Sequence, residues 1–276
     1  MTEPGTEPGT EPGTESGVLL IIGSGHSGST VIDMSLGRRS GMLSLGEFDR
    51  IGDYLQHDPT CVCGLRFSAC SFWQPLLAEA PDAAARGGDP LVLAGAVARR
   101  MPDIRWLVDS SKKTERARAL HLRAPDRTRV LHLTRDGRGV MGSHSKQGFR
   151  NLADFARAWA RDNTAARALV DELGPGRARH LTYEEFCRDP DGVVSGVLEW
   201  LSPGMGAAPP RTDRRTHNIA GNRKRFTFHK RVVEDLGWRD RLSSDDLDAF
   251  EREAGALNRA FLDAPGAWSL RAAGDP

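Results

Sequence analysis

The sequence predicts an α/β fold in three layers, with a central parallel sheet flanked by helices. Three observations support this class: short runs rich in Val, Ile and Leu, longer helical segments after most of them, and a glycine-rich loop directly after the first run. Parallel strands are buried on both faces, so they read as continuous apolar runs, and helices connect them. Runs of this kind with helices between them therefore indicate a parallel sheet.

Four runs are predicted to be strands, and a fifth resembles one. The four cover residues 18–23, 105–109, 129–134 and 178–182, and three of them precede longer segments of helical character. Each run is too short to form a helix of ordinary length. The fifth run, Leu-Ser-Leu-Gly-Glu-Phe over 43–48, is strand-like and ends at a Gly-Glu pair.

Two segments carry the clearest helical signals. Over 149–173 the apolar residues, Phe155 and Trp159 among them, recur at a period near 3.6 residues, which predicts a packing helix. The Gly-Pro-Gly that follows ends it. A second helix is predicted over 243–262, with Ser243 or Ser244 as its N-cap and acidic residues in its first turn.

Composition excludes several classes of function. The chain has 276 residues and a net charge of +1, because 38 Lys and Arg oppose 37 Asp and Glu, which excludes bulk electrostatic binding to nucleic acid. The longest apolar run is too short to cross a membrane, and no secretory signal pattern is present. We expect a protein of the reducing cytoplasm with no nucleic-acid or membrane partner; the sequence is silent on oligomeric state.

The N-terminus repeats the tetrad Thr-Glu-Pro-Gly. Such a sequence neither builds a helix ladder nor buries an apolar face. We therefore expect residues 1–17 to be a disordered tail and residues 18–276 to form the folded domain.

A glycine-rich loop, Gly-Ser-Gly-His-Ser-Gly-Ser-Thr over 23–30, joins the first strand to a helix. Backbone N–H groups and the helix dipole converge there, which predicts an anion site, and glycines at 23, 25 and 28 permit positive φ. The spacing fits the nucleotide-binding P-loop, except that Ser29 replaces the lysine that contacts triphosphates. A P-loop small-molecule kinase is thus an alternative that the missing lysine disfavours, and a tight turn without a ligand is another.

This loop resembles the 5′-phosphosulfate loop of sulfotransferases that use 3′-phosphoadenosine 5′-phosphosulfate (PAPS). The resemblance implies donor contacts from Gly25, His26, Ser27, Gly28, Ser29 and Thr30. Cytosolic members carry Lys-Ser-Gly-Thr, and Golgi and tyrosylprotein members carry Arg in place of that Lys. His26 takes the basic position, where an imidazole with a pKa near about 6.5 serves only when protonated or hydrogen-bonding. This departure leaves a catalytically inactive nucleotide-binding module as a further alternative.

A second phosphate site is predicted at Arg135 and Ser143. Arg135 directly follows the run over 129–134, and Ser143 comes eight residues later in a predicted helix. A guanidinium binds two phosphate oxygens and a hydroxyl donates a third hydrogen bond. The spacing and the strand-turn-helix context are similar to the sulfotransferase site for the 3′-phosphate, although each residue alone is typical of a solvent-exposed side chain.

Two further segments resemble parts of the family's nucleotide site. Arg223, Lys224 and Arg225 lie in a basic stretch, 211–231, that resembles the late loop closing over the 3′-phosphate. The alternatives are a solvated face or a nucleic-acid patch, and the latter predicts steep salt dependence. Tyr183 is followed by Asp-Pro, as in the family's segment whose tyrosine lies by the adenine; a core aromatic at a strand end is the alternative.

The chemistry itself needs alignment, charge stabilisation and a base for the acceptor hydroxyl. The Gly-Glu pair ending at Glu47 resembles tyrosylprotein sulfotransferases, where a Gly-Glu at this point carries the catalytic base. Cytosolic members place a His base near the strand that here ends in Asp-Ser-Ser-Lys-Lys; this segment has no His, which favours Glu47. Lys112 or Ser110 is expected to stabilise charge on the leaving phosphate, with His26 also at the reaction centre.

Three cysteines raise the question of a metal. Cys61, Cys63 and Cys70 lie near His57, and four nitrogen and sulfur ligands make a closed zinc site. However, Cys-x-Cys-x6-Cys is not a standard zinc spacing, and His57 lies across a proline turn. We therefore predict no metal, since backbone amides and basic side chains can neutralise the donor. Related bacterial sulfotransferase-like sequences carry a similar Cys-x-Cys-Gly…Cys-x-Phe-Trp loop.

The ordered set of motifs thus resembles a bacterial PAPS-dependent sulfotransferase over most of 18–231, within a predicted sulfotransferase domain of 18–276. The resemblance implies in-line sulfuryl transfer to a hydroxyl of a small molecule or glycan, with a carboxylate base and a role in bacterial secondary metabolism. The acceptor pocket is expected around 48–76 and 140–150, where no motif is readable.

Overall fold

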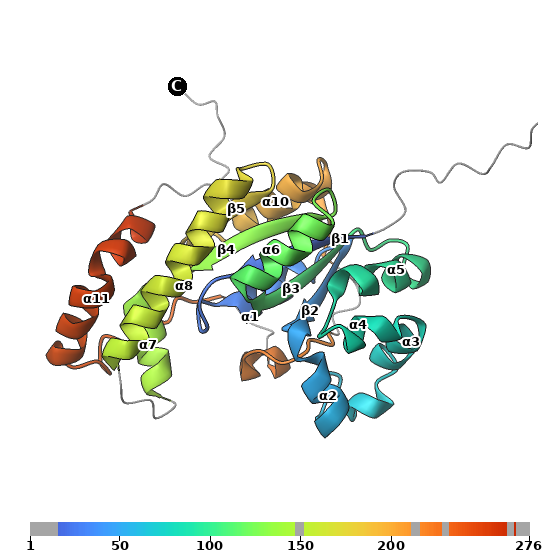
Figure 1. Cartoon of the computed structure of the whole chain (residues 1–276), viewed down its shortest axis with the longest axis horizontal. Coiled ribbons are helices and arrows are strands. Elements are labelled where there is room, and N and C mark those ends of the chain that lie inside the picture. The colour runs from blue at the N-terminus through green and yellow to red at the C-terminus, as the bar shows by residue number, and fades with distance from the viewer. Residues whose placement is uncertain (1–15, 147–151, 211–215, 228–231, 264–267, 269–276) are drawn as a thin grey trace, which may run out of the picture.

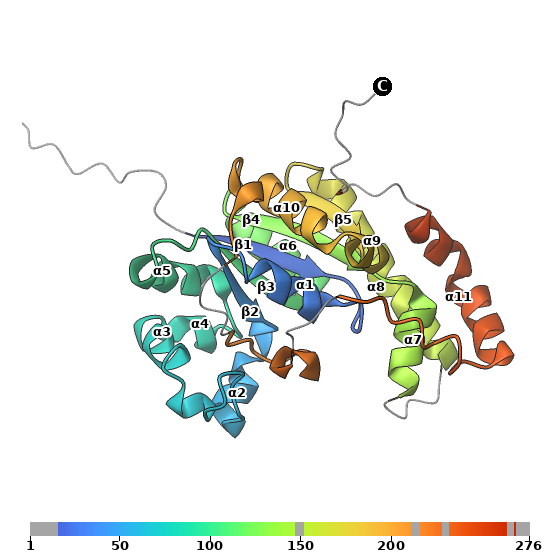
Figure 2. The ribbon, with the colours of Figure 1, turned by 180° about the vertical axis from the view of Figure 1, so that it is seen from behind.

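The computed structural model describes residues 16–146, 152–210, 216–227, 232–263 and 268 (Figure 1). Within these residues a five-stranded sheet carries helices on both faces, as the reverse view in Figure 2 also shows. The predicted three-layer α/β fold is confirmed.

All five strands are parallel and lie in the order β2-β3-β1-β4-β5. In chain order they are β1 (Gly17–Ile22), β2 (Met42–Gly46), β3 (Trp106–Lys112), β4 (Thr128–Thr134) and β5 (Ala178–Thr182). The four predicted strands are present, with ends that differ by at most three residues. The fifth, strand-like run forms β2 at one edge of the sheet.

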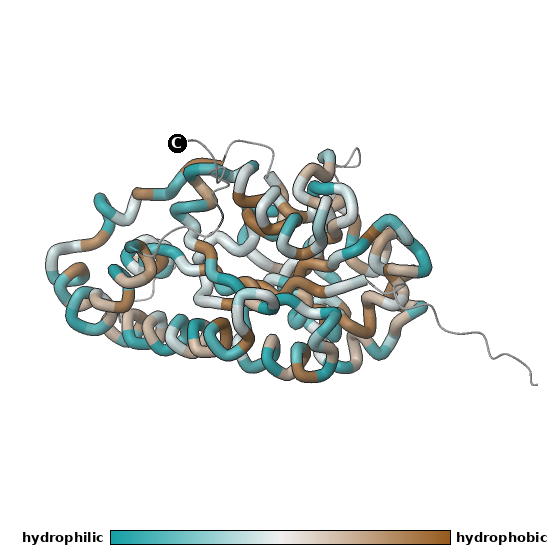
Figure 3. Tube along the Cα trace, turned by 90° about the horizontal axis from the view of Figure 1, so that it is seen from above, coloured by the Kyte–Doolittle hydropathy of each residue, from teal (hydrophilic) through white to brown (hydrophobic). Residues whose placement is uncertain are grey.

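The apolar runs are buried on both faces, as parallel strands require. Along β1 successive side chains alternate between two cores: Val18 and Leu20 belong to one, Leu19 and Ile21 to the other. Helices α5 (Pro90–Arg100), α6 (Thr114–Arg123) and α8 (Leu152–Leu173) cover the first face, and α1 (Ser29–Leu36), α9 (Tyr183–Arg188) and α10 (Pro190–Leu201) the second. Figure 3 shows the hydrophobic residues concentrated along the inner strands.

The remaining helices extend the domain on two sides. Beyond β2 lie α2 (Ile51–His57), α3 (Trp73–Glu79) and α4 (Pro81–Ala85), which belong to the first core. On the other side, α7 (Gly137–Ser145) and α11 (Ser244–Leu262) pack with α8 around Trp159 and Phe250. Among the described residues, no helix is long and apolar enough to cross a bilayer.

Both predicted helices are present. Helix α8 ends at Leu173 as predicted, while the predicted start at residues 149–151 lies outside the described residues. Helix α11 is capped by Ser243, whose hydroxyl accepts the Asp246 N–H at 3.2 Å, and the Asp246 carboxylate accepts the Ser243 N–H at 3.0 Å. This reciprocal capping box satisfies two of the amides that a helix start leaves unpaired.

The predicted tail, 1–17, lies outside the described residues except at its last two positions. Ser16 is buried and its hydroxyl donates to the carbonyl of Ile104 at 2.8 Å. Gly17 is the first residue of β1, and a Cβ there would lie 2.6 Å from the Trp106 ring. The first strand therefore begins one residue earlier than the sequence predicts.

Candidate active site

Each of the five strands leads to a residue or loop that the sequence predicts to be functional. β1 leads into the loop 23–28, β2 leads to Glu47, β3 ends in Lys112, β4 leads to Arg135 and β5 leads to Tyr183. Because the strands are parallel, their carboxyl ends meet at one edge of the sheet, where open α/β sheets bind their ligands. The fold thereby gathers five separate parts of the sequence (Figure 1).

The glycine-rich loop uses two of its three glycines for backbone geometry. Gly23 and Gly28 have φ values of 127° and 91°, and a Cβ on Gly28 would lie 2.5 Å from the Tyr183 ring. Gly25 does not have a positive φ, contrary to expectation, and a Cβ there would meet no atom within 4 Å. The residue that does adopt the left-handed conformation is His26, at φ 61°. Backbone strain of this kind in a non-glycine residue is typical of functional sites.

Ser27 offers a buried hydroxyl to the loop's ligand. Its side chain is 1% exposed, and its Oγ has no hydrogen-bond partner among the described residues. An unsatisfied buried hydroxyl costs free energy unless something binds it. Ser29 and Thr30 begin α1 and are also buried, with the Thr30 hydroxyl accepting the Asn222 N–H at 3.1 Å. An anion seated on the loop would therefore find a donor that the protein itself does not use.

Lys112 and Glu47 form an ion pair beside the loop. The Lys112 Nζ lies 2.5 Å from the Glu47 Oε1 and also donates to the Ser110 carbonyl at 3.0 Å. Both charged side chains are less than one-fifth exposed. Lys112 has a φ of 67°, a second non-glycine residue in the left-handed region, and its carbonyl accepts the Gly23 N–H at 3.3 Å. The fold thus holds a cation and a carboxylate beside Gly23, the first residue of the glycine-rich loop.

Arg135 lies on the other side of the loop. Its guanidinium donates to the His26 carbonyl at 3.2 Å and to the Asp235 carbonyl at 2.7 Å, and it stacks 4.7 Å over the Tyr183 ring. Burial raises the pKa of the Tyr183 hydroxyl, which stays protonated and donates to the Val233 carbonyl at 3.2 Å. Arg135 and Tyr183 therefore bind the loop to residues 233–235.

His26 does not carry the positive charge that its position suggests. Burial lowers its pKa below the ordinary 6.5, the nearby Lys112 and Arg135 cations lower it further, and Glu47 opposes them more weakly. The imidazole, which packs edge-on against His144 at 4.8 Å, is thus neutral at pH 7. Lys112 and Arg135 are cations beside the loop, and of the two roles expected of His26, protonated or hydrogen-bonding, the lowered pKa favours the hydrogen-bonding one.

Ser143 lies on α7, the helix that packs against the Arg135 guanidinium. Its hydroxyl donates to the Gly139 carbonyl at 2.9 Å, one turn earlier in α7. A Cβ on Gly139 would lie 3.0 Å from the Arg135 Nε, so that α7 packs closely on the guanidinium. The predicted pair is therefore brought to one place, with the Ser143 hydroxyl engaged by its own backbone in this state.

The basic segment covers the N-terminus of α1. Residues 223–226 form a single 3-10 turn, with Arg223 and Lys224 exposed and Arg225 donating to Gly221 and Tyr54. A Cβ on Gly221 would lie 3.8 Å from the Glu47 Oε1. The rest of the predicted basic stretch, 211–215 and 228–231, lies outside the described residues.

Asp33 anchors a buried network that sequence reasoning missed. It accepts hydrogen bonds from Ser44 at 2.5 Å, Ser110 at 2.9 Å and the Asn218 amide at 3.2 Å. Burial raises the pKa of this carboxyl to about 7. The network links α1, β2, β3 and the segment after residue 216 directly beneath the site. The signal in the sequence was polar side chains, Ser44 and Ser110, inside strands that are otherwise buried.

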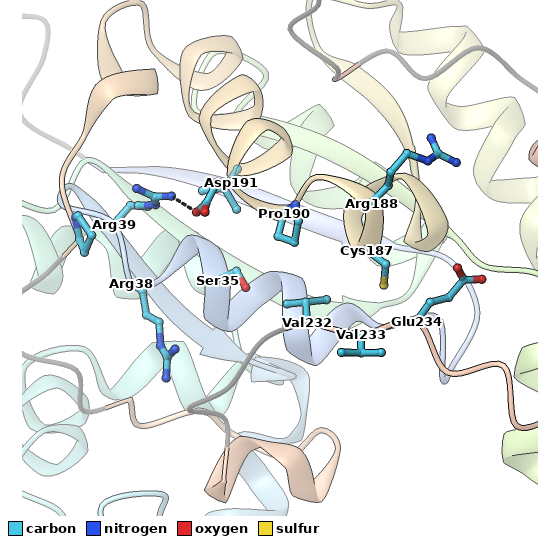
Figure 4. A pocket seen from close by; sticks show the side chains of 12 residues that line it. Ser35, Arg38, Arg39, Cys187, Arg188, Pro190, Asp191, Val232, Val233 and Glu234 are labelled. Carbon is cyan, nitrogen blue, oxygen red and sulfur yellow. Dashed lines mark hydrogen bonds and ion pairs between the residues drawn. The ribbon is translucent and has the colours of Figure 1, made fainter.

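A cavity of about 770 Å³ lies between the C-terminal end of α1 and the start of α10 (Figure 4). Ser35 and Arg38 from α1, Cys187 from the end of α9, and Val233 line it. Val233 is the residue whose carbonyl accepts the Tyr183 hydroxyl. Tyr183, Arg135, Glu47 and Lys112 are all absent from its lining, so that this cavity lies outside the candidate active site.

Comparisons with known proteins show the fold and the family. Two solved structures share the fold. The sulfotransferase domain from the Synechococcus PCC 7002 olefin synthase has a TM-score of 0.56 and 22% identity, and the match covers 90% of this chain and 98% of that one. The sulfotransferase domain from the curacin biosynthetic pathway has a TM-score of 0.50 and 16% identity, and the match covers 88% of this chain and 97% of that one. A search of curated protein sequences gave no significant match. Residues 19–203 match the model of the sulfotransferase family. The chain is therefore an enzyme of the sulfotransferase family.

Proposed function

We propose that the enzyme transfers the sulfuryl group of PAPS to a hydroxyl of a small molecule or glycan. One observation carries this proposal: the glycine-rich loop, the cations Lys112 and Arg135 and the Glu47 carboxylate meet at one edge of the sheet. The buried Ser27 hydroxyl, without a partner among the described residues, fits a bound phosphosulfate. No metal is needed for the transfer itself, since backbone amides, Lys112 and Arg135 supply the positive field.

The donor would lie across the carboxyl ends of β1, β4 and β5. Its phosphosulfate would take the N–H groups of the loop 25–30, and its 3′-phosphate would take Arg135 and Ser143. Tyr183, whose ring lies beneath the Arg135 guanidinium, would contact the adenine. Arg223, Lys224 and Arg225 would close over the bound nucleotide, as the Asn222 contact with Thr30 already holds their segment against α1.

Glu47 is the base in this proposal. The acceptor oxygen forms a bond to sulfur, the bond from sulfur to the 5′-phosphate oxygen breaks, and the acceptor proton passes to the Glu47 carboxylate. Lys112 would turn from Glu47 toward the bridging oxygen, which frees the carboxylate and neutralises charge on the leaving 3′,5′-bisphosphate. The Lys112 Nζ and the Glu47 Oε1 lie 2.5 Å apart, so that both groups can contact the same reacting atoms.

The proposal also covers the acceptor segments and the cellular setting. Helix α2 and the second half of α7 lie within the segments 48–76 and 140–150, which we expect to bind the acceptor. The four cysteines are unpaired, which fits a reducing cytoplasm. We place the reaction in bacterial secondary metabolism, in keeping with similar structures from an olefin synthase and the curacin pathway.

Nucleotide binding tests the donor. Adenosine 3′,5′-bisphosphate at a hundred times its dissociation constant is expected to stabilise the fold by about 2.7 kcal/mol, a shift that thermal melting detects. ATP with Mg²⁺ is the comparison, and Ser29 in place of the P-loop lysine predicts no effect from it. Stabilisation by ATP with Mg²⁺ alone would reject PAPS as donor and favour a kinase.

A further inference from the structure

Three cysteines and one histidine converge beside the site described above. The ligand atoms of Cys61, Cys63, Cys70 and His217 all lie within 4.8 Å of one another. The Cys70 Sγ lies 3.7 Å from the Cys61 Sγ, 3.9 Å from the Cys63 Sγ and 3.3 Å from the His217 Nδ1. The Cys61 Sγ lies 3.6 Å from the same nitrogen. His217 comes from a segment 147 residues after Cys70.

These separations are those of a tetrahedral metal site. Bonds of about 2.3 Å from zinc to sulfur and about 2.0–2.1 Å from zinc to nitrogen place the sulfurs about 3.8 Å apart and each sulfur about 3.6 Å from the nitrogen. Two of the three sulfur pairs, at 3.7 and 3.9 Å, and two of the three sulfur–nitrogen pairs, at 3.6 and 3.3 Å, match that tetrahedron, and the other two pairs lie within 4.8 Å. We propose that Cys61, Cys63, Cys70 and His217 bind one zinc ion.

The backbone and the surrounding rings prearrange the four ligands. A tight turn brings the first two cysteines together: the Cys61 N–H donates to the Leu65 carbonyl at 2.8 Å, and Gly64, at φ 92°, donates to the Cys61 carbonyl at 2.9 Å. Gly64 is needed there because an L side chain rarely adopts that φ.

Phe72 and Trp73 hold His217 in place, through its ring and its backbone carbonyl respectively. Its ring stacks on Phe72 with centroids 4.5 Å apart and an interplanar angle of 10°, and its carbonyl accepts the Trp73 indole N–H at 2.6 Å. Supporting contacts of this kind orient metal-ligating imidazoles. The Nδ1 is thereby presented to the three sulfurs rather than to solvent.

The ligand set favours zinc and a structural role. Three sulfurs and an imidazole suit zinc and exclude magnesium and calcium, which take oxygen ligands. Four protein ligands close the coordination shell and leave no position for substrate. The site therefore departs from the expectation of a chain without metal. It also differs from the sequence hypothesis in its histidine, because His57 is exposed at the end of α2 and is not in the cluster.

The metal would anchor the segment that completes the active site. Two residues beyond His217, Ile219 exchanges backbone hydrogen bonds with the end of β2: its N–H donates to Leu45 at 2.8 Å and its carbonyl accepts the Glu47 N–H at 2.7 Å. Figures 1 and 2 both show this segment beside α2 and the carboxyl end of β2. Zinc would thus tie the cysteine turn to the strand end that positions Glu47.

Metal analysis of the whole chain tests the proposal. Protein purified in reducing buffer with zinc supplied, then desalted, is expected to hold about one zinc per chain by mass spectrometry. C70S and H217A are expected to lose it. H57A and C187S are the matched controls, since each removes a residue of the same type outside the cluster, and both should retain the metal.

Cobalt supplies a readout that does not depend on the folding of variants. Cobalt added to the metal-free protein is expected to give the thiolate-to-metal charge-transfer bands and intense visible bands of a tetrahedral site. Octahedral cobalt spectra would overturn the proposal. So would zinc below about 0.1 per chain in folded protein, zinc retained in both C70S and H217A, or a disulfide between Cys61 and Cys70 under these reducing conditions.

The positioning role has its own test, which rests on the proposed function. Removal of zinc by a chelator is expected to weaken binding of adenosine 3′,5′-bisphosphate about tenfold, because the metal and the nucleotide stabilise the same segment. Equal affinities with and without zinc would overturn the positioning role. A bisphosphate that binds neither form would instead count against PAPS as donor, while the zinc content stands as a separate result.

Discussion

Glu47→Gln is expected to lower turnover by about 10²–10⁴, the usual contribution of a general base, while binding of adenosine 3′,5′-bisphosphate stays unchanged. Glutamine keeps the shape of the side chain and can still accept a hydrogen bond from Lys112, but it cannot take the acceptor proton. Steady-state kinetics with a working acceptor, together with calorimetric titration of the bisphosphate, measure the two effects.

Asp49→Asn is the matched control. Asp49 lies two residues further on and pairs with Lys113 at 2.6 Å, much as Glu47 pairs with Lys112. Lys113 is largely exposed whereas the Asp49 carboxylate is buried, and this second pair shares no side chain with the first, so that D49N should keep its turnover. Full turnover in E47Q would remove Glu47 from the base role and leave the donor assignment intact. Equal losses in E47Q and D49N would mean that the carboxylates act on folding, not on the proton.

Arg135→Lys is expected to weaken adenosine 3′,5′-bisphosphate binding about 10- to 100-fold, since each hydrogen bond to a charged group contributes about 1.5–3 kcal/mol. Lysine keeps the positive charge but lacks the planar fork that binds two phosphate oxygens. Adenosine 5′-monophosphate has no 3′-phosphate, so that its affinity should change little. Titration of both nucleotides against the same variant isolates the 3′-phosphate contact.

Arg138→Lys controls for the loss of a neighbouring guanidinium. Arg138 pairs with Asp136 at 2.7 Å and lies 4.5 Å over the Trp238 ring, away from the loop. Its variant should bind both nucleotides normally. If R135K weakened the monophosphate as much as the bisphosphate, Arg135 would act by holding His26 and Asp235 in place rather than by binding the 3′-phosphate.

Local patterns in the sequence predict the sheet and most of the site. The loop at 23–30, Glu47, Lys112, Arg135 and Tyr183 each follow a recognisable strand, and a parallel sheet necessarily brings strand ends together. The strand-helix order therefore carries both the fold and the positions of these side chains.

Long-range pairings are what the sequence does not predict. His217 approaches the cysteines only because the segment after residue 216 returns to pair with the end of β2. Spacing rules for zinc consider neighbours along the chain and pointed instead to His57. The Asp33 network is hidden for the same reason, since its donors come from β2, β3 and residue 218.

Charge states are a further limit on sequence-based prediction. The residue type at position 26 suggests a cation, but burial and the nearby Lys112 and Arg135 lower the pKa of the imidazole. Both the burial and the two neighbouring cations arise only in the folded protein. Lys112 supplies the charge from another strand, and its left-handed backbone has no signature in the sequence.

Transfer of radiolabelled sulfuryl from PAPS tests the central claim most directly. The protein is incubated with labelled donor and separate phenol, aliphatic alcohol and glycan acceptors, with E47Q as the blank. A PAPS-dependent sulfotransferase predicts label on at least one hydroxyl acceptor and release of adenosine 3′,5′-bisphosphate, both far slower in E47Q. A protein that binds the bisphosphate yet neither labels any acceptor nor consumes the donor would contradict that claim and be an inactive nucleotide-binding module.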